Sequence, residues 1–506
     1  MSLTNLFGNG GKKLSDLLKP SDAYSVSIKE NPLITGIKYD SRYVVPGDLF
    51  FAVKGFVNDG NKYIGDVIDK GAAAVISENE VEKKYKEYWI KTDDIRLAIS
   101  RISSIFYDFP WRDSLMVGIT GTNGKTTSTY LMKSIFEKAG YTPGVLGTIG
   151  YLVGENKIQA SRTTPEAPEI NLMLRTMQKK GVKCCIMEVS SHSLELKRVA
   201  DIQFDCVIFT NLTTDHMDYH LSMENYYQAK KKLFSLIKKG GFAVVNVDDT
   251  YGVRLAREVQ AKGERVITYG KNDAADIRII NYSINDDGSR ITINACGKKY
   301  ELNTPLYGVP NVYNVTTSFA VGWGMSIEPQ VLISGIENVK LVEGRMERIN
   351  CGQDFTVIVD FAHTPDALMN LLLTVRQISS GRVITVFGCG GNRDKSKRPM
   401  MGQHAAILSD YTIVTSDNPR NEEPLEIISD ILTGINEVKK TVKYKVVEDR
   451  REAIKLAVQM AKKGDTIVIA GKGHEINQII KGKEYPFDDR KIAADFIKDK
   501  LNGKIS

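Results

Sequence analysis

A short apolar run followed by a glycine-rich loop constrains the fold of this chain more than any other feature. Residues 115–120 (LMVGIT) are mostly apolar or β-branched, as in a buried strand, and residues 121–127 (GTNGKTT) follow directly. Apolar residues then recur at four-residue spacing up to Gly140, which predicts a helix that ends there. A strand, a glycine loop and a helix N-terminus in this order form a cradle for phosphate.

The loop also carries the side chains that a nucleotide site needs. Backbone N–H groups and the helix dipole attract the anion, Lys125 reaches the outer phosphates, and the Thr126 hydroxyl can bind Mg²⁺. The usual pattern has glycine where Ile119 stands, and Gly118 lies one residue early, so the match has one departure. We expect a nucleoside triphosphate site, with an ordinary strand-to-helix turn as the alternative. The loop residues expected to bind the nucleotide are Gly121, Thr122, Asn123, Gly124, Lys125, Thr126 and Thr127.

The rest of the chain indicates an α/β protein of several domains. A chain of 506 residues is too long to fold around a single hydrophobic core and suggests about three domains of ~150 residues each. In the last third, apolar strands alternate with helical patterns, which predicts a mainly parallel sheet. These expected strands are residues 357–359, 383–387, 411–415 and 466–470. We place the domains at residues 1–110, 111–340 and 341–506, with a linker at residues 109–113.

Charge and cysteine usage narrow the class of partner. The net charge of +7, from 68 basic and 61 acidic residues, is too small and too spread to indicate nucleic-acid binding. The six cysteines lack C-x-x-C spacing, which indicates reduced thiols in a cytoplasmic protein. We expect no signal peptide and no membrane insertion, because no apolar stretch reaches about 18 residues. Small anionic molecules are the expected partners, and we expect a monomer.

Polar groups follow two central strands where open α/β sheets bind ligands. Glu188 lies near the end of the apolar run at residues 184–189, and His216 follows the run at residues 206–210. A carboxylate and an imidazole placed beside Thr126 suit a divalent ion that phosphate also holds. Five of the six histidines lie in such strand-end segments, namely His192, His216, His220, His363 and His474, whereas His404 is expected on a helix surface.

A lysine on an apolar helix face is the sharpest local feature. A helix is predicted from Met223 to about Lys238, with Ser222 as its N-cap. Lys230 falls in the middle of the apolar face of this helix. A buried lysine is costly unless it is paired or chemically changed. The alternative is a lysine whose ammonium reaches water along an apolar stem.

Three further patterns are weaker. Asn311 and Asn314 are three residues apart at the start of a predicted helix and share a face. Residues 40–42 (DSR) lie between two expected strands, either as a displayed polar group or as a charged hairpin turn. The glycines after Phe387 faintly resemble a dinucleotide-binding turn, but no suitable acidic residue completes that pattern.

Seven motifs spread over nearly the whole chain resemble those of the Mur ligases. They are GTNGKTT, EVSSH, YxxAK around Lys230, GVPNVYN, EGRME, DFAHTPDAL and GKGHE. The DSR turn and DNPR at residues 417–420 are similar to those of the members that add meso-2,6-diaminopimelate to UDP-N-acetylmuramoyl-L-Ala-D-Glu. The resemblance implies three domains: a smaller N-terminal α/β domain for the uridine nucleotide, a central P-loop ATPase with a mainly parallel sheet, and a Rossmann-like domain for the amino acid.

The resemblance also implies roles for individual residues. Lys230 would be carbamoylated to N6-carboxylysine and would bind Mg²⁺ with Thr126, Glu188 and His216, so that Lys125, Glu188, His216 and Lys230 form the catalytic set. Further ATP contacts would be Asn311, Arg345 and Asp360; the UDP-substrate contacts Ser41, Thr163, Thr164, Ser190 and Arg198; and the diaminopimelate contacts Arg393, Asp417, Asn418, Arg420, Gly471 and Glu475. Two positions depart from the family pattern: Phe361 stands where tyrosine is frequent, and Leu196 where some members have glutamine.

The implied activity is ATP-dependent amide formation through an acyl phosphate, in cytoplasmic synthesis of peptidoglycan precursors. Arg420 favours diaminopimelate over lysine, because a guanidinium can hold the additional carboxylate in bidentate fashion. The alternatives are the lysine-adding version of the same ligase, a ligase like folylpolyglutamate synthase, and a non-catalytic nucleotide-binding protein of cell-wall assembly. A P-loop GTPase or motor is disfavoured, because no guanine-reading feature is present.

Overall fold

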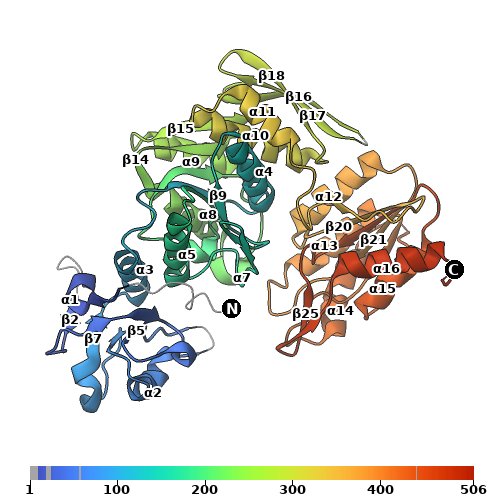
Figure 1. Ribbon diagram of the computed structural model, residues 1–506. Coiled ribbons are helices and arrows are strands. Elements are labelled where there is room, and N and C mark those ends of the chain that lie inside the picture. The colour runs from blue at the N-terminus through green and yellow to red at the C-terminus, as the bar shows by residue number, and fades with distance from the viewer. Residues whose placement is uncertain (1–9, 19–23, 56–57, 286, 440, 506) are drawn as a thin grey trace. The chain divides into compact units, whose positions relative to one another are not determined.

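The computed structural model describes residues 10–18, 24–55, 58–285, 287–439 and 441–505 (Figure 1). By their internal contacts, the residues fall into two compact units. The first unit comprises Met1–Gly118, Tyr141–Val207 and Ala229–Gly241, and the second comprises Ile119–Gly140, Ile208–Gln228 and Phe242–Ser506. The predicted α/β class with mainly parallel sheets is confirmed. In the part of the chain that is described, no helix is long and apolar enough to cross a membrane.

A five-stranded sheet begins the first unit. Its order is β2-β7-β6-β5-β4, and every neighbouring pair is parallel except β2 with β7. The strands are β2 (Tyr24–Val26), β4 (Gly36–Lys38), β5 (Asp48–Phe51), β6 (Ala74–Ser77) and β7 (Trp89–Thr92), with helices α2 (Ile64–Asp69) and α3 (Ile95–Phe106). The hairpin interpretation of the DSR turn is wrong, because the chain leaves β4 through a 3₁₀ helix at Ser41–Tyr43 and re-enters the sheet in the same direction.

The largest sheet carries the glycine loop. In the first unit its order runs β11-β10-β9-β12-β8-β13-β14, and in the second unit it continues from β14 through β15 (Arg265–Gly270) to β16, β17 and β18. The strands of the first stretch are β8 (Leu115–Thr120), β9 (Pro143–Leu146), β10 (Tyr151–Val153), β11 (Asn156–Ile158), β12 (Cys184–Glu188), β13 (Phe204–Phe209) and β14 (Ile237–Asn246). The predicted strands at residues 115–120, 184–189 and 206–210 are therefore confirmed.

Helices pack on this sheet where the apolar spacing predicted them. Helix α4 (Lys125–Lys138) follows the glycine loop, and α5 (Ala167–Lys179) begins with a capping box between Glu166 and Glu169. Helix α10 (Val309–Gly324) begins one residue after Gly308, as expected from residues 308–314. The remaining helices here are α6 (Ser191–Glu195), α7 (Met217–His220), α9 (Thr250–Gln260) and α11 (Pro329–Glu337).

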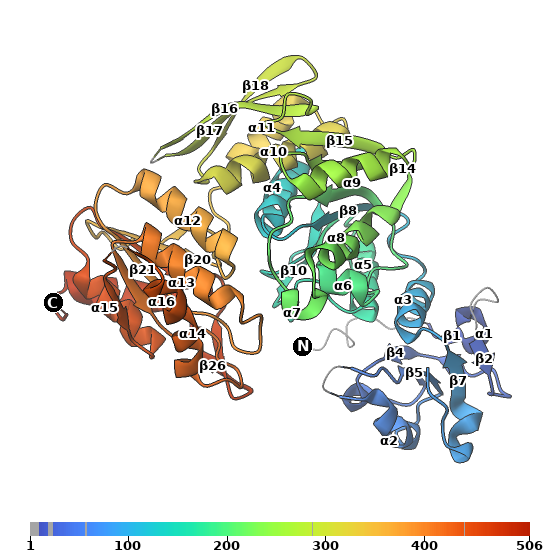
Figure 2. The ribbon, with the colours of Figure 1, turned by 180° about the vertical axis from the view of Figure 1, so that it is seen from behind.

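Two features of the central region differ from the sequence-based expectation. Helix α8 spans only Met223–Lys231; a 3₁₀ turn at Lys232–Ser235 follows and β14 begins at Ile237, so the helix predicted to Lys238 is wrong at its end. The second difference is an antiparallel ladder of β16 (Ile277–Asn285), β17 (Gly288–Ala295) and β18 (Lys298–Thr304), visible in Figure 2, which no motif indicated.

The last third of the chain forms a six-stranded sheet in the second unit. Its order is β19-β20-β24-β21-β22-β23, and all neighbours are parallel except β19 with β20. The strands are β19 (Glu347–Arg348), β20 (Thr356–Asp360), β21 (Val383–Phe387), β22 (Tyr411–Val414), β23 (Tyr444–Val446) and β24 (Thr466–Ala470). This confirms the predicted strands and their parallel arrangement, and adds β19 and β23.

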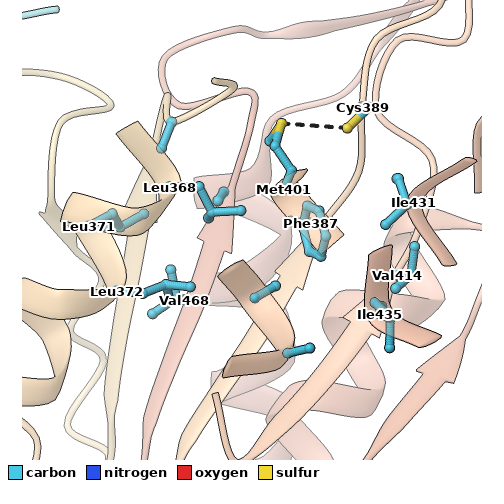
Figure 3. Packing of buried hydrophobic residues seen from close by; sticks show 14 of the residues in the cluster. Leu368, Leu371, Leu372, Phe387, Cys389, Met401, Val414, Ile431, Ile435 and Val468 are labelled. Atoms are coloured by element: carbon cyan, nitrogen blue, oxygen red, sulfur yellow. Dashed lines mark hydrogen bonds between the residues drawn. The ribbon is translucent and has the colours of Figure 1, made fainter. Parts of the chain in front are cut away.

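Separate apolar clusters cover the two faces of this sheet. Helices α12 (Pro365–Ile378), α13 (Lys397–Leu408) and α14 (Pro424–Asn436) supply the cluster on one face, shown in Figure 3, where Cys389 Sγ lies 3.6 Å from Met401 Sδ. Helices α15 (Arg450–Met460) and α16 (Asp489–Leu501) supply the cluster on the other face. With both faces covered, the polar residues after each strand stand at the carboxyl edge of the sheet, where such sheets bind ligands.

Candidate active site

The loop between β8 and α4 depends on glycine at two positions. Gly121 has a φ of 150° and Gly124 a φ of 88°, in the region that side-chain-bearing residues avoid. A Cβ atom on Gly121 would lie 1.8 Å from the hydroxyl oxygen of Thr210, and one on Gly124 would lie 2.5 Å from Oδ1 of Asn314. The loop therefore needs these glycines both for its backbone angles and for its close neighbours.

Neighbouring side chains of the second unit hold the loop in place. The Asn123 N–H donates to Asn211 Oδ1 at 2.9 Å, and the Thr210 hydroxyl donates to the Asn123 carbonyl at 2.7 Å. The Lys125 ammonium donates to the carbonyls of Gly121 and Thr122, each at 2.9 Å. The cation thus lies over the loop at the N-terminus of α4, where an anion is favoured.

Replacing Gly124 with alanine should raise the KM for ATP about tenfold or more, since the added Cβ must displace Asn314 from the loop. Gly140 provides a matched control, because its φ of 87° is nearly the same but a Cβ there meets nothing within 4 Å. Gly140→Ala should leave the KM for ATP unchanged while bearing a similar backbone strain. Steady-state kinetics in ATP compare the two variants, and equal KM values would reject the role given to the Gly124–Asn314 contact.

Residues from beyond position 340 reach this loop within the second unit. The Arg345 guanidinium donates to the Thr126 hydroxyl at 3.1 Å, and Asn123 Nδ2 donates to Asp366 Oδ2 at 2.8 Å. Burial raises the pKa of Asp360, while the nearby Arg345 charge partly offsets this effect. Each Asp360 carboxylate oxygen accepts a hydrogen bond from a backbone N–H: Oδ2 from Met346 and Oδ1 from Ala362, both at 2.7 Å. Arg345 therefore contacts the loop, and Asp360 lies close to the Arg345 charge.

The two asparagines at the start of α10 are joined as their spacing indicates. Asn314 Nδ2 donates to Asn311 Oδ1 at 2.9 Å, and Asn311 Nδ2 donates to the Tyr307 carbonyl at 2.7 Å. The Ser128 hydroxyl of α4 donates to Asn314 Oδ1 at 3.3 Å. This pair thus connects α10 to the first turn of the helix that follows the glycine loop.

A buried charged cluster in the second unit went unnoticed in the sequence. Asp215 Oδ1 accepts the His216 N–H at 2.9 Å and lies 3.8 Å from the Lys397 ammonium. Burial alone raises the pKa of Asp215, but the charges of His216, Lys397 and His363 outweigh it and bring the pKa to about 2. Burial and the Lys397 charge lower the pKa of His363 to about 4, so its imidazole is neutral at pH 7.

Sequence spacing could not pair these groups, because Asp215 and Lys397 are far apart in the chain. The only signal was the position of His216 and His363 after strands of two different sheets. His216 has a φ of 58°, a left-handed backbone that a non-glycine residue adopts at a cost of roughly 1–2 kcal/mol. Such strain is frequent at functional sites.

The first unit gathers the expected UDP-substrate residues around the end of β12. The Thr164 hydroxyl donates to the Glu188 carbonyl at 2.8 Å, and the Ser190 N–H donates to the Thr164 hydroxyl at 3.0 Å. Arg198 donates to the Thr164 carbonyl at 3.0 Å and pairs with Glu166 at 2.8 Å. The structure therefore brings Thr164, Ser190 and Arg198 together beside Glu188.

The Glu188 carboxylate is fully buried. Thr148 donates to it twice, from its N–H at 3.1 Å and from its hydroxyl at 2.9 Å, and this hydroxyl also lies 3.1 Å from that of Thr163. Thr148 was not recognised in the sequence, because it belongs to no motif. Ser41 lies in the 3₁₀ turn after β4, where its carbonyl accepts a hydrogen bond from Lys70 at 2.8 Å.

Lys230 is buried on α8, and its side chain is about 2% exposed. The alternative in which its ammonium reaches water is therefore wrong. Ser222 caps the helix as expected, because its hydroxyl accepts the Asn225 N–H at 3.1 Å. Lys232, two residues further, is exposed and pairs with Glu195 at 2.7 Å. Burial of an uncharged derivative of Lys230 costs less than burial of its ammonium, whereas burial of an anionic derivative requires an opposite charge or a metal beside it.

The donor chemistry fits a magnesium ion. Glu188 in the first unit and the Thr126 hydroxyl in the second unit are each buried oxygen donors, the class that Mg²⁺ prefers. No group of three or more His, Cys, Asp or Glu side chains able to hold a metal occurs among the described residues. The expected ligand set contains only two side chains of these four residue types, Glu188 and His216, so it does not require a group of three.

The loops after β22 and β24 bring together most of the expected diaminopimelate residues. Asn418 Nδ2 donates to Glu475 Oε2 at 2.8 Å, and Asp417 Oδ1 accepts the Asn418 N–H at 2.6 Å. A Cβ on Gly471 would lie 2.4 Å from Asp417 Oδ2, so glycine is required there. Asp417 Oδ2 is buried and makes no hydrogen bond with a described residue, so it can accept from a ligand.

Two arginines face the same loops. Arg420 has a φ of 53° and donates to the Gly391 carbonyl at 2.8 Å. Burial and the nearby Arg393 charge lower the pKa of Arg420, whereas Asp417 and Glu475 raise it. Arg393 donates to the Asn392 carbonyl at 2.9 Å. Two guanidinium groups and two carboxylates at one edge are complementary in charge to a ligand that carries both carboxylate and ammonium groups.

Protein-family comparisons match three segments of the chain. A model of the Mur ligase family catalytic domain matches residues 33–107, the Mur ligase middle domain matches residues 119–322, and the Mur ligase glutamate ligase domain matches residues 344–473. The motifs from which the resemblance was drawn fall mostly within these segments.

Curated proteins and solved structures are similar over nearly the whole chain. A UDP-N-acetylmuramoyl-L-alanyl-D-glutamate–2,6-diaminopimelate ligase of Syntrophomonas wolfei is 42% identical over 97% of this chain and all of its own. The enzyme of the same name from Clostridium tetani is 42% identical over 96% of this chain and 99% of its own. A solved structure of such a ligase has a TM-score of 0.67 at 29% identity and covers 97% of this chain and 99% of its own.

The fold is also shared with a more distant ligase. The structure of Mycobacterium tuberculosis folylpolyglutamate synthase with ADP has a TM-score of 0.61 at 15% identity, over 74% of this chain and 91% of its own. At this identity the likeness concerns the fold alone.

Proposed function

The chain belongs to the Mur ligase family, and on that premise we propose that it joins meso-2,6-diaminopimelate to UDP-N-acetylmuramoyl-L-Ala-D-Glu with hydrolysis of ATP. The product is a UDP-N-acetylmuramoyl-tripeptide, a cytoplasmic precursor of peptidoglycan. Full-length similarity to diaminopimelate-adding ligases supports this substrate pair.

One observation carries the proposal. The Arg345 guanidinium donates to the Thr126 hydroxyl beside Lys125, so a residue from beyond position 340 completes the phosphate loop in the second unit. Asp417, Arg420 and Glu475 stand at the carboxyl edge of the sheet that follows Arg345 in the chain. A single unit therefore holds both the groups for ATP and the groups for the amino acid.

We assign the sites as follows. The domains are residues 1–110 for the UDP substrate, 111–340 for ATP and 341–506 for the amino acid, which the positions of the three family matches support. The proposed contacts are, for ATP, Gly121 to Thr127, Asn311, Arg345 and Asp360; for the UDP substrate, Ser41, Thr163, Thr164, Ser190 and Arg198; and for diaminopimelate, Arg393, Asp417, Asn418, Arg420, Gly471 and Glu475. The protein acts as a monomer in the cytoplasm.

Mg²⁺ is the proposed metal, held by Thr126, Glu188, His216 and carbamoylated Lys230. When bound, it supplies positive charge to the phosphate oxygens during transfer. The oxygen-rich donor set supports this assignment. The ring nitrogens of neutral His363 and the Lys397 ammonium complete the polar surroundings in the second unit.

The reaction proceeds in two steps. A D-glutamyl carboxylate oxygen attacks the γ-phosphorus, the bond to the β,γ-bridging oxygen breaks, and ADP leaves with an acyl phosphate formed. Lys125 and the loop N–H groups stabilise charge on the transferring oxygens. The diaminopimelate amino group, near Glu475 and Asp417, attacks the acyl carbon in its neutral form; the bond from that carbon to the phosphate oxygen breaks, and the proton lost by the amine leaves with inorganic phosphate. Arg420 orients the amine by holding the distant carboxylate.

Two alternatives remain within the same chemistry. A lysine-adding ligase would leave Arg420 without its carboxylate partner and opposite an ammonium group, which disfavours it. A folylpolyglutamate synthase shares the fold but gives no reason for Asp417 to Arg420 to carry this charge pattern.

An amino-acid screen tests the proposal. The protein is incubated with ATP, Mg²⁺ and UDP-N-acetylmuramoyl-L-Ala-D-Glu, and each of diaminopimelate, lysine and glutamate is supplied in turn. We expect a product of the tripeptide mass with diaminopimelate alone. Folate with glutamate provides the control for the folylpolyglutamate alternative. Product formation with lysine and none with diaminopimelate would overturn the assignment.

A further inference from the structure

A buried lysine beneath the amino-acid loops has no role in the function described so far. Lys472 lies between Gly471 and Gly473 after β24, and its side chain is 0% exposed. Its ammonium donates to Asn418 Oδ1 at 3.1 Å, to Glu475 Oε2 at 2.9 Å and to the Asn477 carbonyl at 2.7 Å. An ammonium has three donors, so these bonds use all of them.

These bonds fix the orientation of the Asn418 amide. Oδ1 accepts from Lys472 and from the Ile479 N–H at 3.0 Å, which forces Nδ2 toward Glu475 Oε2. An ammonium can only donate, so an inverted amide would place two donors against each other. Lys472 thereby determines which end of Asn418 faces the carboxylate.

Because of the same bonds, the two oxygens of the Glu475 carboxylate differ in their hydrogen bonding. Oε2 accepts from both Lys472 and Asn418, whereas Oε1 has no hydrogen bond with any described residue. The Glu475 side chain is about one-third exposed. Oε2 is thus held by the protein, whereas Oε1 can accept a hydrogen bond from a ligand.

Backbone contacts extend this arrangement to Arg420. The strand β25 (Asn477–Ile480), whose first carbonyl accepts from Lys472, also accepts the Arg420 N–H at the Ile479 carbonyl, at 3.0 Å. Lys472 therefore connects the loop after β24 to the segment that carries the expected specificity arginine.

We infer that Lys472 is a positioning residue, which aligns Glu475 and Asn418 to receive the ammonium group of the incoming amino acid. This inference rests on the proposed function, because it takes diaminopimelate as the ligand. Lys472 does not touch the substrate; it acts through Glu475. Without Lys472, the Glu475 carboxylate can rotate. Glu475 Oε2 and Asn418 Oδ1 each lose a charged hydrogen-bond donor.

Steady-state kinetics of Lys472→Met test the inference. We expect the KM for diaminopimelate to rise about tenfold or more, since a charge-assisted network is lost, while the KM values for ATP and the UDP substrate stay the same. Lys472→Arg keeps the charge but cannot place three donors at these acceptors, so it serves as a second variant if Lys472→Met fails to fold. Lys483→Met, at an exposed position of the adjoining strand β26 (Lys483–Pro486), is the matched control and should change none of the three constants.

A double-mutant cycle with Glu475→Gln separates positioning from simple support of the fold. If Lys472 acts through Glu475, the Lys472 substitution adds little to the KM in the Glu475→Gln background. Multiplicative effects, or an unchanged KM for diaminopimelate in folded Lys472 variants, would overturn the inference alone. Absence of diaminopimelate turnover by the unsubstituted protein would overturn the proposed function, and this inference with it.

Discussion

Substitution of Lys230 by alanine is expected to lower kcat by at least ~10³-fold, which is the largest single effect we predict. The lysine is buried on α8, and its proposed carbamoyl group supplies an anionic oxygen ligand for Mg²⁺. Alanine removes this oxygen, so charge on the transferring phosphoryl group loses its compensation. The rate of phosphate release with saturating substrates gives kcat, and circular dichroism confirms that the variant is folded.

The neighbouring Lys232 supplies a matched control, because it is exposed and pairs with Glu195 on the surface. Lys232→Ala should retain wild-type kcat. Added acetate or formate should restore part of the Lys230→Ala activity, since a small carboxylate can occupy the space of the missing group. Absence of a carbamate signal in the ¹³C NMR spectrum of folded, fully active enzyme kept in ¹³C-bicarbonate would contradict the proposed modification.

Arg420→Ala is expected to remove most of the preference for diaminopimelate over lysine, a change of about 10²-fold in the ratio of the two kcat/KM values. The two amino acids differ by one carboxylate at the far end. Arg420 can hold that carboxylate, because Nη1 donates to Gly391 while Nε and Nη2 make no hydrogen bond with a described residue. The loss should arise from a lower kcat/KM for diaminopimelate.

The left-handed backbone of Arg420, with a φ of 53°, and the Gly391 contact fix where the guanidinium points. Burial lowers its pKa from a high starting value, so it remains charged near neutral pH. Arg451→Ala controls for a general loss of positive charge, because Arg451 is exposed on α15, which packs on the same sheet. This variant should leave the ratio of the two kcat/KM values unchanged. An Arg420→Ala variant that still rejects lysine as strongly as before would exclude this source of specificity.

The sequence predicted those features that depend on local spacing. The glycine loop, the strand before it and the helix after it required only residues 115–140, and parallel pairing followed from the alternation of strands and helices. The burial of Lys230 followed from its place among apolar neighbours at helical spacing. Asn311 and Asn314 were paired for the same reason, since one helical turn separates them.

Local spacing also explains the errors. Apolar residues continue past Lys231 at intervals that fit a helix, so the pattern gave no sign that the chain becomes a 3₁₀ turn and then a strand. The parallel pairing of β4 with β5 was unexpected, because a connection of nine residues usually joins antiparallel strands. The ladder from β16 to β18 lies in a polar segment whose strands pair chiefly with one another.

The contacts that sequence reasoning missed join residues that are far apart in the chain. Asp215 meets Lys397, Asn123 meets Asp366, and Lys472 meets Asn418, each through folding of distant segments. None of these contacts has a periodic signature. Only the structure could indicate that Lys472, which lies among glycines in a motif, points inward with all three donors used.

Transfer of ¹⁸O from the substrate carboxylate to phosphate tests the central claim most directly. UDP-N-acetylmuramoyl-L-Ala-D-Glu labelled in its D-glutamyl carboxylates is turned over with ATP and diaminopimelate, and the released phosphate is analysed by mass. An acyl phosphate passes one carboxylate oxygen to phosphate, so we predict one labelled oxygen in the phosphate for each amide bond formed. Unlabelled phosphate accompanying tripeptide formation would contradict the account.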